Sequence, residues 1–300
     1  MSNFKIVQSF WSKPFLEAAK KNKNLWLNKE MFFISNALSV LKLKEFYSNV
    51  ELVTDHYGKR ILIDILKLPY DSVDLSLNDI DNYRHELWAV GKIKAYSIQN
   101  EPFLHIDNDV FLWKAFEESF LTNPLFCQNF ENNVEYYSKI TEEIKENAFK
   151  IPKEMTPYIE NKANLNGYEG INAGIIGGND LDFFKKYCQL AFNIIDKNYN
   201  KLDNLSSINP FNVFFEQALF HSLSIHDNVH VEKLFPPTDK SFIELVRIEN
   251  IPSSFYIHPV AVWKKSIHIN EYIYITLKES YPEYFERIQT LLKEKYHEVF

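Results

Sequence analysis

Residues 4–106 alternate short apolar segments with longer segments of helical periodicity. The strand candidates are 4–10, 50–54 and the segment Phe103-Leu104-His105-Ile106. The helix candidates are 31–46, 56–68 and 84–98. Strands that alternate with helices form parallel sheets with helices on both faces. This alternation predicts an α/β fold with a mostly parallel central sheet flanked by helices.

The rest of the chain adds helices and one more strand. The periodicity predicts helices at 180–199 and 210–223, a strand at 255–258 and an amphipathic C-terminal helix at 282–299. Residues 115–165 are mixed, with a charged helical segment at 136–149 followed by prolines and asparagines. We interpret 115–165 as a helical excursion over the active face and as a candidate flap.

Composition excludes several classes of function. The 300 residues include 33 Lys and Arg against 40 Asp and Glu, a net charge of -7, so we expect no nucleic-acid partner. Cys127 and Cys188 lack metal-site spacing, and we expect a reducing compartment, the cytoplasm. No segment is long and apolar enough for a transmembrane helix. The mixed charges near the C-terminus leave peripheral attachment to a membrane open.

The glycines are concentrated in one short segment. Five of the seven lie between residues 167 and 178. Glycine is needed where the backbone takes a positive φ or approaches another group closely. The segment therefore predicts either a bulged strand with tight turns or a backbone that lines a ligand.

Three Asp-x-Asp triplets are present, and their contexts differ. The triplet at 79–81 lies in a polar loop, and the one at 180–182 opens a predicted helix, where acidic residues favour the helix dipole. Asp107 and Asp109 directly follow a strand candidate, at the sheet edge where α/β proteins bind ligands. Two adjacent carboxylates repel unless a cation joins them, and oxygen ligands suit Mg²⁺ or Mn²⁺. The alternative for this triplet is a capped turn.

His258 ends the last strand candidate, and Lys264 follows six residues later. This spacing predicts an imidazole and an ammonium group near one strand end. Together with Asp107 and Asp109, His258 would complete a ligand set of oxygen and nitrogen for a divalent cation. The alternative is a packed or surface histidine.

These segments resemble the metal-dependent glycosyltransferases of the GT-A fold, most closely the retaining family 8 type that includes lipopolysaccharide galactosyltransferases and glycogenin. Asp107-Asn108-Asp109 after a strand is similar to that family's Asp-x-Asp metal motif, and Asn172-Ala173-Gly174 is similar to its Asn-Ala-Gly segment. Glu216-Gln217 resembles its Asp-Gln pair, and His258 and Lys264 have its histidine-to-lysine spacing. The resemblance covers about residues 4–265 and implies a GT-A (Rossmann-like) sheet.

The resemblance implies a role for each of these residues. Asp107, Asp109 and His258 would hold Mn²⁺ or Mg²⁺ on the diphosphate of a nucleotide sugar, and Lys264 would contact the same diphosphate. The residues implied to bind the donor are Lys92, Asn172, Ala173 and Gly174, and the implied catalytic residues are Glu216 and Gln217. The implied reaction moves a hexose from a UDP-sugar to an unknown acceptor hydroxyl, with retention. The cation and Lys264 would neutralise the leaving diphosphate.

The same resemblance implies a domain organisation. Residues 1–265 would form the catalytic domain, divided into a nucleotide-sugar-binding half at 1–114, the excursion at 115–165 and a half for the donor sugar and acceptor at 166–265. Residues 266–300 would form a C-terminal helical extension. The chain departs from the family pattern at Glu216, which stands in place of aspartate, and in lacking a glycine between His258 and Lys264.

Two other functions remain open. A phosphohydrolase of the haloacid dehalogenase kind also uses Asp-x-Asp after a strand, although Phe111 stands where that class has threonine or valine. A non-catalytic nucleotide-sugar-binding protein of the same fold would keep the same residues. An inverting transferase would need a general base, for which Glu216 and Glu169 are the candidates.

Overall fold

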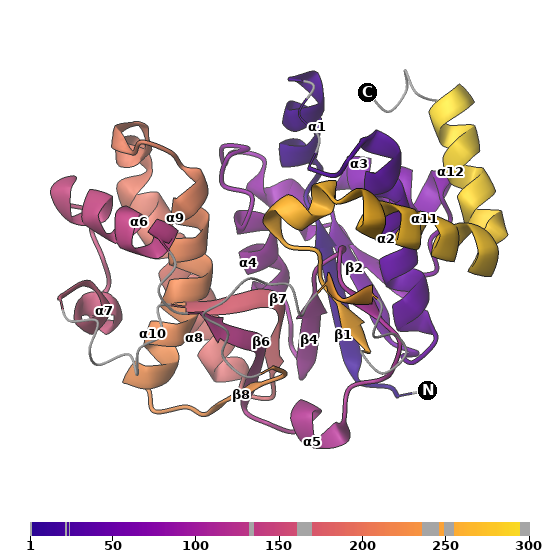
Figure 1. Cartoon of the computed structure of the whole chain (residues 1–300). Coiled ribbons are helices and arrows are strands. Elements are labelled where there is room, and N and C mark those ends of the chain that lie inside the picture. The colour runs from indigo at the N-terminus through magenta and orange to yellow at the C-terminus, as the bar shows by residue number, and fades with distance from the viewer. Residues whose placement is uncertain are drawn as a thin grey trace. The chain divides into compact units, whose positions relative to one another are not determined.

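The computed structural model describes residues 2–21, 23, 25–131, 135–160, 170–235, 246–248 and 255–294. The chain divides into two compact units, each built from separate stretches of sequence (Figure 1). Unit 1 consists of Met1–Asp81, Ile106–Ala115 and Ser241–Phe300, and unit 2 of Asn82–His105 and Phe116–Lys240. The domain boundaries expected at residues 114, 165 and 265 stay a prediction.

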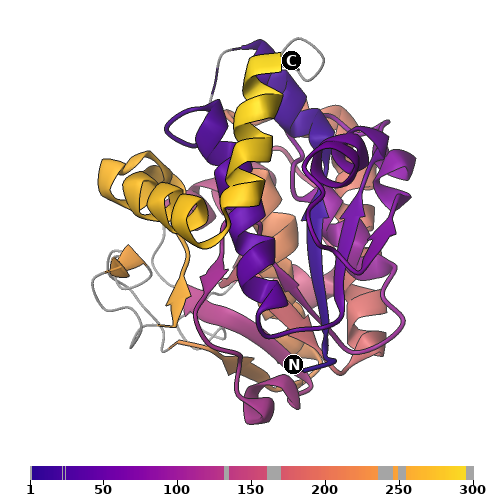
Figure 2. The same cartoon turned by 90° about the vertical axis from the view of Figure 1, so that its right-hand side faces the viewer.

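Unit 1 begins with the strand and helix alternation predicted from the sequence. Its elements, with η marking a short 3₁₀ or π turn, are β1 (Lys5–Phe10), α1 (Ser12–Lys20), α2 (Lys29–Lys44), β2 (Val50–Thr54), α3 (His56–Lys59), η1 (Arg60–Ile65), β3 (Ser72–Asp74), η2 (Ser76–Ile80), β5 (Phe111–Leu112), β9 (Tyr256–Ile257), η9 (Ala261–Lys265), α11 (Ile267–Ser280) and α12 (Pro282–Glu294). Figure 2 shows α12, in yellow, lying along α2. The C-terminal helix expected at 282–299 is therefore present up to Glu294, and residues 295–300 lie outside the described residues.

Unit 2 holds most of the remaining helices. Its elements are α4 (Val90–Ser97), β4 (Phe103–Ile106, whose last residue belongs to unit 1), α5 (Glu118–Leu121), β6 (Leu125–Glu131), α6 (Glu135–Glu146), η3 (Lys153–Met155), α7 (Thr156–Glu160), β7 (Gly170–Gly178), α8 (Leu181–Asn198), η5 (Tyr199–Asn204), α9 (Asn209–Val213), η6 (Phe214–Ala218), α10 (Leu219–His226) and β8 (Val231–Lys233). No helix in the described part of either unit is long and apolar enough to cross a membrane.

The described strands form a seven-stranded sheet in the order β3-β2-β1-β4-β7-β6-β8, and β5 and β9 form a separate pair. Within unit 1, β1 pairs in parallel with β2, and β2 with β3. Within unit 2, β6 is antiparallel to β7 and parallel to β8. Nearly every residue of β1 and β2 is buried or half-buried, as expected of strands covered on both faces. These observations confirm the predicted α/β class with a mostly parallel sheet flanked by helices.

The start of one predicted helix of unit 2 was wrong. The helix expected at 84–98 begins only at Val90, because the Asn212 side chain accepts a hydrogen bond from Ala89 N at 3.0 Å and sets the first turn there. The helix expected at 210–223 is present as α9, the π turn η6 and α10, which follow one another without a gap. The segment 115–165 also contains a sheet strand, β6, that the sequence analysis did not expect.

The glycine-rich segment forms β7, in which every residue is buried. A Cβ atom on Gly177 would overlap the carbonyl oxygen of Phe103 in β4. Close approach of the neighbouring strand therefore explains the glycine at this position. Gly167, another glycine of the predicted segment, lies outside the described residues.

Candidate functional site

Buried polar side chains of unit 1 hold the turn that carries the two aspartates. Val110 N donates to the Asp107 carbonyl at 3.0 Å and closes the turn. Ser35 Oγ of α2 donates to the Asn108 carbonyl at 3.1 Å, and the Asn108 amide donates to Asn36 Oδ1 at 2.7 Å. These side chains satisfy polar groups of the turn after β4 ends. These hydrogen bonds hold residues 107–110 in one conformation.

His258 lies close to this turn because β9 pairs with β5. The antiparallel register places Ile257 opposite Phe111. Trp113 N extends the pairing by donating to the Phe255 carbonyl at 2.7 Å. Since His258 is the first residue after β9, the pairing positions its imidazole next to residues 107–109 of the same unit.

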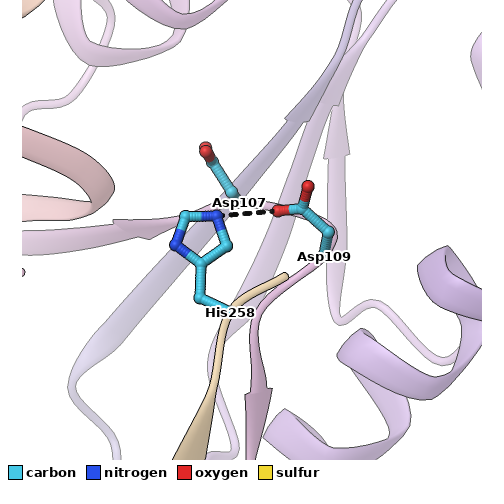
Figure 3. Close-up of side chains that lie close together, drawn as sticks. All are labelled: Asp107, Asp109 and His258. Carbon is cyan, nitrogen blue, oxygen red and sulfur yellow. Dashed lines mark ion pairs between the residues drawn. The ribbon is translucent and has the colours of Figure 1, made fainter. Parts of the chain in front are cut away.

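Asp107, Asp109 and His258 each offer one ligand atom, and these atoms all lie within 4.8 Å of one another. Figure 3 shows the imidazole of His258 turned toward the Asp109 carboxylate, with Nε2 3.4 Å from Oδ1. Lys264 of η9 forms an ion pair with Oδ2 of the same carboxylate. The structure thus brings together the four residues predicted around the metal and diphosphate, which we call the acidic cluster.

Lys264 and His258, which lie beside Asp109, keep it ionised. Burial opposes ionisation, but Lys264 and His258 outweigh it and hold the pKa of Asp109 well below its ordinary value. Burial, together with the charges of Asp107 and Asp109, raises the pKa of the Tyr256 hydroxyl well above its ordinary value. The acidic cluster therefore contains an ionised Asp109 beside a phenol that stays neutral.

The acidic cluster fits a divalent cation. Within the described residues, Asp109 Oδ1 is buried and accepts no hydrogen bond. A divalent cation next to this oxygen would add to the stabilisation that Lys264 and His258 already give the carboxylate. Two carboxylates and an imidazole provide three ligands and leave coordination positions for other oxygen atoms.

The other predicted site residues lie in unit 2, and four of them are joined by hydrogen bonds through β7. Asn172 Oδ1 accepts a hydrogen bond from Gly174 N at 2.9 Å. Lys92 of α4 donates to the carbonyl of Ala173, which lies between them, at 3.0 Å. The side chains of Lys92 and Asn172 therefore brace the same three residues of the strand.

Lys92 also forms a buried ion pair with Glu216. The distance from Lys92 Nζ to Glu216 Oε1 is 2.8 Å, and the two side chains are 11% and 0% exposed. Tyr96 OH donates to the same carboxylate oxygen at 3.2 Å, and Tyr187 OH donates to the Glu216 carbonyl at 2.8 Å. Glu216 lies on the π turn η6, a rare geometry that is frequent at functional sites.

The charge of Lys92 also acts on His105 in β4. Burial, reinforced by Lys92, lowers the pKa of His105 well below its ordinary value. The imidazole packs edge-on against the ring of Tyr96, with 5.0 Å between the ring centroids. His105 is therefore neutral, and the positive charge among these residues is on Lys92.

Gln217 joins a second group of polar side chains in unit 2. Tyr137 OH lies 2.8 Å from Gln217 Oε1 and 3.0 Å from Glu131 Oε2, and Asn172 Nδ2 donates to Glu131 Oε1 at 2.9 Å. A phenol has one proton to donate, so both contacts are satisfied if the Gln217 amide is turned to donate to Tyr137, which then donates to Glu131. A Cβ atom on Gly170 would overlap the phenol ring, so glycine permits this approach.

Glu131 and Tyr137 were missed by the sequence analysis. Glu131 ends β6, whose apolar character is interrupted by Gln128 and Asn129, so it lacks the clear signal that identified Asp107. It also falls in the segment interpreted as an excursion. Tyr137 has no comparable signal, because its position depends on the register that pairs Glu131 with Gly170. Glu169, one of the two candidate bases, lies outside the described residues.

Comparisons with known proteins give one family and a distant structural similarity. The fold is similar to that of mouse xyloside xylosyltransferase 1 in its apo form, with a TM-score of 0.39 and 12% identity over 78% of this chain and 85% of the other. No curated protein matches the sequence significantly. The model of a family of unknown function, DUF6734, matches residues 4–291. This match covers nearly the whole chain, and the protein therefore belongs to the DUF6734 family.

Proposed function

We propose that this protein is a glycosyltransferase of the GT-A type that moves a hexose from a nucleotide sugar, a UDP-sugar, to an acceptor hydroxyl, with retention and with Mn²⁺ or Mg²⁺. The observation that carries the proposal is the acidic cluster. Asp107, Asp109 and His258 place three ligand atoms within 4.8 Å of one another, and Lys264 adds a positive charge beside them. This donor set matches the chemistry of a diphosphate bound through a divalent cation.

In this proposal, Asp107, Asp109 and His258 hold the cation, and Lys264 binds the diphosphate directly. The cation, when bound, supplies Lewis-acid stabilisation of the leaving nucleoside diphosphate. Lys264 adds to this by neutralising negative charge as the bond to the sugar breaks. To do so its ammonium group exchanges its ion pair with Asp109 for a phosphate oxygen.

The residues of unit 2 are assigned to the donor sugar. We assign Asn172, Ala173 and Gly174 of β7 to the donor sugar, with Lys92 bracing the strand as described above. Gln217 is half-buried and is the residue of η6 that we assign to direct contact. Glu216 is fully buried, so we assign it a positioning role through Lys92 rather than contact with the sugar.

The burial of Glu216 also supports retention. A general base in an inverting reaction must reach the acceptor hydroxyl within hydrogen-bond distance. The carboxylate of Glu216 is instead enclosed, with Lys92 and Tyr96 on Oε1. This arrangement disfavours Glu216 as that base.

The test is release of UDP from a panel of UDP-sugars, assayed with Mn²⁺, with Mg²⁺ and with a chelator. We expect release that requires the metal, that falls at least about a hundredfold in Asp109→Asn and that is unchanged in Asp182→Asn. Asp182 belongs to another Asp-x-Asp triplet and its side chain is 92% exposed, so it is a matched control.

The other outcomes distinguish the alternative functions. Binding of UDP without release from any UDP-sugar would favour a non-catalytic nucleotide-sugar-binding protein. Phosphate release from a phosphomonoester, abolished by Asp107→Asn, would favour a phosphohydrolase. Equal UDP release with and without metal would contradict the role proposed for the acidic cluster.

A further inference from the structure

Exposed large hydrophobic side chains are concentrated in unit 1. Among the described residues they are Leu25, Leu27, Val262, Ile267 and Ile275. The first two lie in the loop between α1 and α2, and Val262 and Ile267 lie in η9 and at the start of α11. Val262 is 77% exposed and Leu25 is 66% exposed. Exposed apolar side chains that are grouped in one region commonly mark a surface that binds a protein or a membrane.

In the loop between α1 and α2, a buried tryptophan separates two exposed leucines. Trp26 is only 3% exposed, whereas Leu25 and Leu27, on either side of it, are exposed. Lys265 of η9 donates a hydrogen bond to the Trp26 carbonyl. This bond joins the loop to η9, so the leucines and Val262 belong to neighbouring segments. We call Leu25, Leu27, Val262 and Ile267, together with Lys21 and Lys23, the apolar-basic surface.

The same segments contain more lysines than acidic residues. Residues 12–29 contain five lysines and one glutamate, and residues 255–270 contain two lysines and no acidic residue. The whole chain, in contrast, has a net charge of -7. Several of these lysines form ion pairs: Lys13 with Asp81, Lys20 with Glu17 and Lys264 with Asp109. Lys21 and Lys23, exposed just before Leu25, are the lysines that we assign to lipid headgroups. Exposed lysine side chains therefore lie next to exposed apolar side chains in this loop.

We propose that the apolar-basic surface binds to membranes that contain anionic lipids. Exposed leucine and isoleucine side chains gain free energy by entering the interface between headgroups and acyl chains, and each nearby lysine adds attraction to an anionic headgroup. A protein partner with an apolar groove would use the leucines, but it would not by itself account for the surplus of lysines beside them. This inference does not depend on the proposed transferase activity.

The test is co-sedimentation of the full chain with phosphatidylcholine vesicles and with vesicles that also contain phosphatidylglycerol. We expect binding to the second kind and a fall in binding at high salt. Leu25→Ser/Leu27→Ser should weaken binding to these vesicles at least about tenfold, because two apolar side chains no longer insert. Ile275→Ser is the matched control, since Ile275 is exposed on α11 outside the apolar-basic surface.

The thermal unfolding midpoint of each variant shows whether it folds. Lys21→Glu/Lys23→Glu tests the contribution of the two lysines to binding separately. Reduced binding in the lysine variant, with an unchanged midpoint, supports the proposal. Failure of the wild-type protein to bind anionic vesicles would overturn it. It would also be overturned if Ile275→Ser weakened binding as much as the leucine substitutions, or if those substitutions only dissociated a dimer of this chain.

Discussion

The acidic cluster of unit 1 and the Lys92–Glu216 pair of unit 2 differ in their balance of negative and positive groups. In unit 2, the carboxylate of Glu216 has an ammonium group at 2.8 Å and a phenol at 3.2 Å. In unit 1, Asp107 and Asp109 lie together, with Lys264 and His258 beside Asp109. The pair of unit 2 sets one carboxylate against one ammonium group, whereas the acidic cluster places two carboxylates next to each other.

This difference separates two kinds of contribution. Removing one member of a buried pair of one cation and one carboxylate leaves the other charge without compensation, and the effect falls mainly on stability. Removing a carboxylate from a cluster with surplus negative charge also relieves repulsion, so the effect falls mainly on binding. The comparison can be tested by substitutions in each region.

The largest effect is expected at Lys92. Because Glu216 would remain buried without its cation, Lys92→Met should lower the free energy of unfolding by about 3–5 kcal/mol. Lys185→Met, which removes an exposed ion pair with Asp182 in the same unit, should change it by less than about 1 kcal/mol. Urea unfolding measures both. Equal losses of unfolding free energy in the two variants would contradict the role assigned to the buried pair.

A smaller effect is expected at Tyr137. Tyr137→Phe removes the hydroxyl that links Glu131 and Gln217, so the free energy of unfolding should fall by about 1–3 kcal/mol. Tyr83→Phe is the control, because Tyr83 OH donates to an exposed carboxylate, Asp196, at 2.8 Å. Its effect in the same urea experiment should be below about 1 kcal/mol. A larger loss in the control would show that burial of the network is not what matters.

The smallest effect is the pH dependence of the acidic cluster. The pKa of Asp109 is lowered in the folded protein, so the unfolded chain takes up the proton first as the pH falls. The stability that ionised Asp109 contributes is therefore complete above its ordinary pKa of about 3.9 and is lost below it. In the presence of chelator, the difference in unfolding free energy between wild type and Asp109→Asn should shrink between neutral pH and about pH 3. A difference that grows in acid would contradict this assignment.

Much of the fold was predictable because buried parallel strands leave a strong signal. Apolar segments such as Phe103–Ile106 and Val50–Thr54 were recognised directly, and Asp180 caps α8 as an acidic residue at a helix start should. β6 escaped recognition because Gln128 and Asn129 interrupt its apolar character next to a β-bulge. Its place in the sheet depends on pairing with β7 and β8, which no local pattern contains.

The site could be predicted to a different extent in the two units. Asp107 and Asp109 follow a strand, so chain geometry alone places them together at its end. His258 is 149 positions from Asp109, and only the pairing of β9 with β5 brings it there. In unit 2, Lys92 and Glu216 were expected only by resemblance. Their ion pair depends on how α4 and η6 pack, which sequence periodicity does not specify.

The most direct test of the central claim is calorimetric titration of UDP into the protein with Mn²⁺ and with chelator, for wild type, Asp109→Asn and Asp182→Asn. If the acidic cluster binds a diphosphate through a cation, UDP should bind wild type and Asp182→Asn only with Mn²⁺. Asp109→Asn, with an unchanged unfolding midpoint, should bind at least about tenfold more weakly. UDP binding that is equal with and without Mn²⁺, or equal in Asp109→Asn and wild type, would contradict the account.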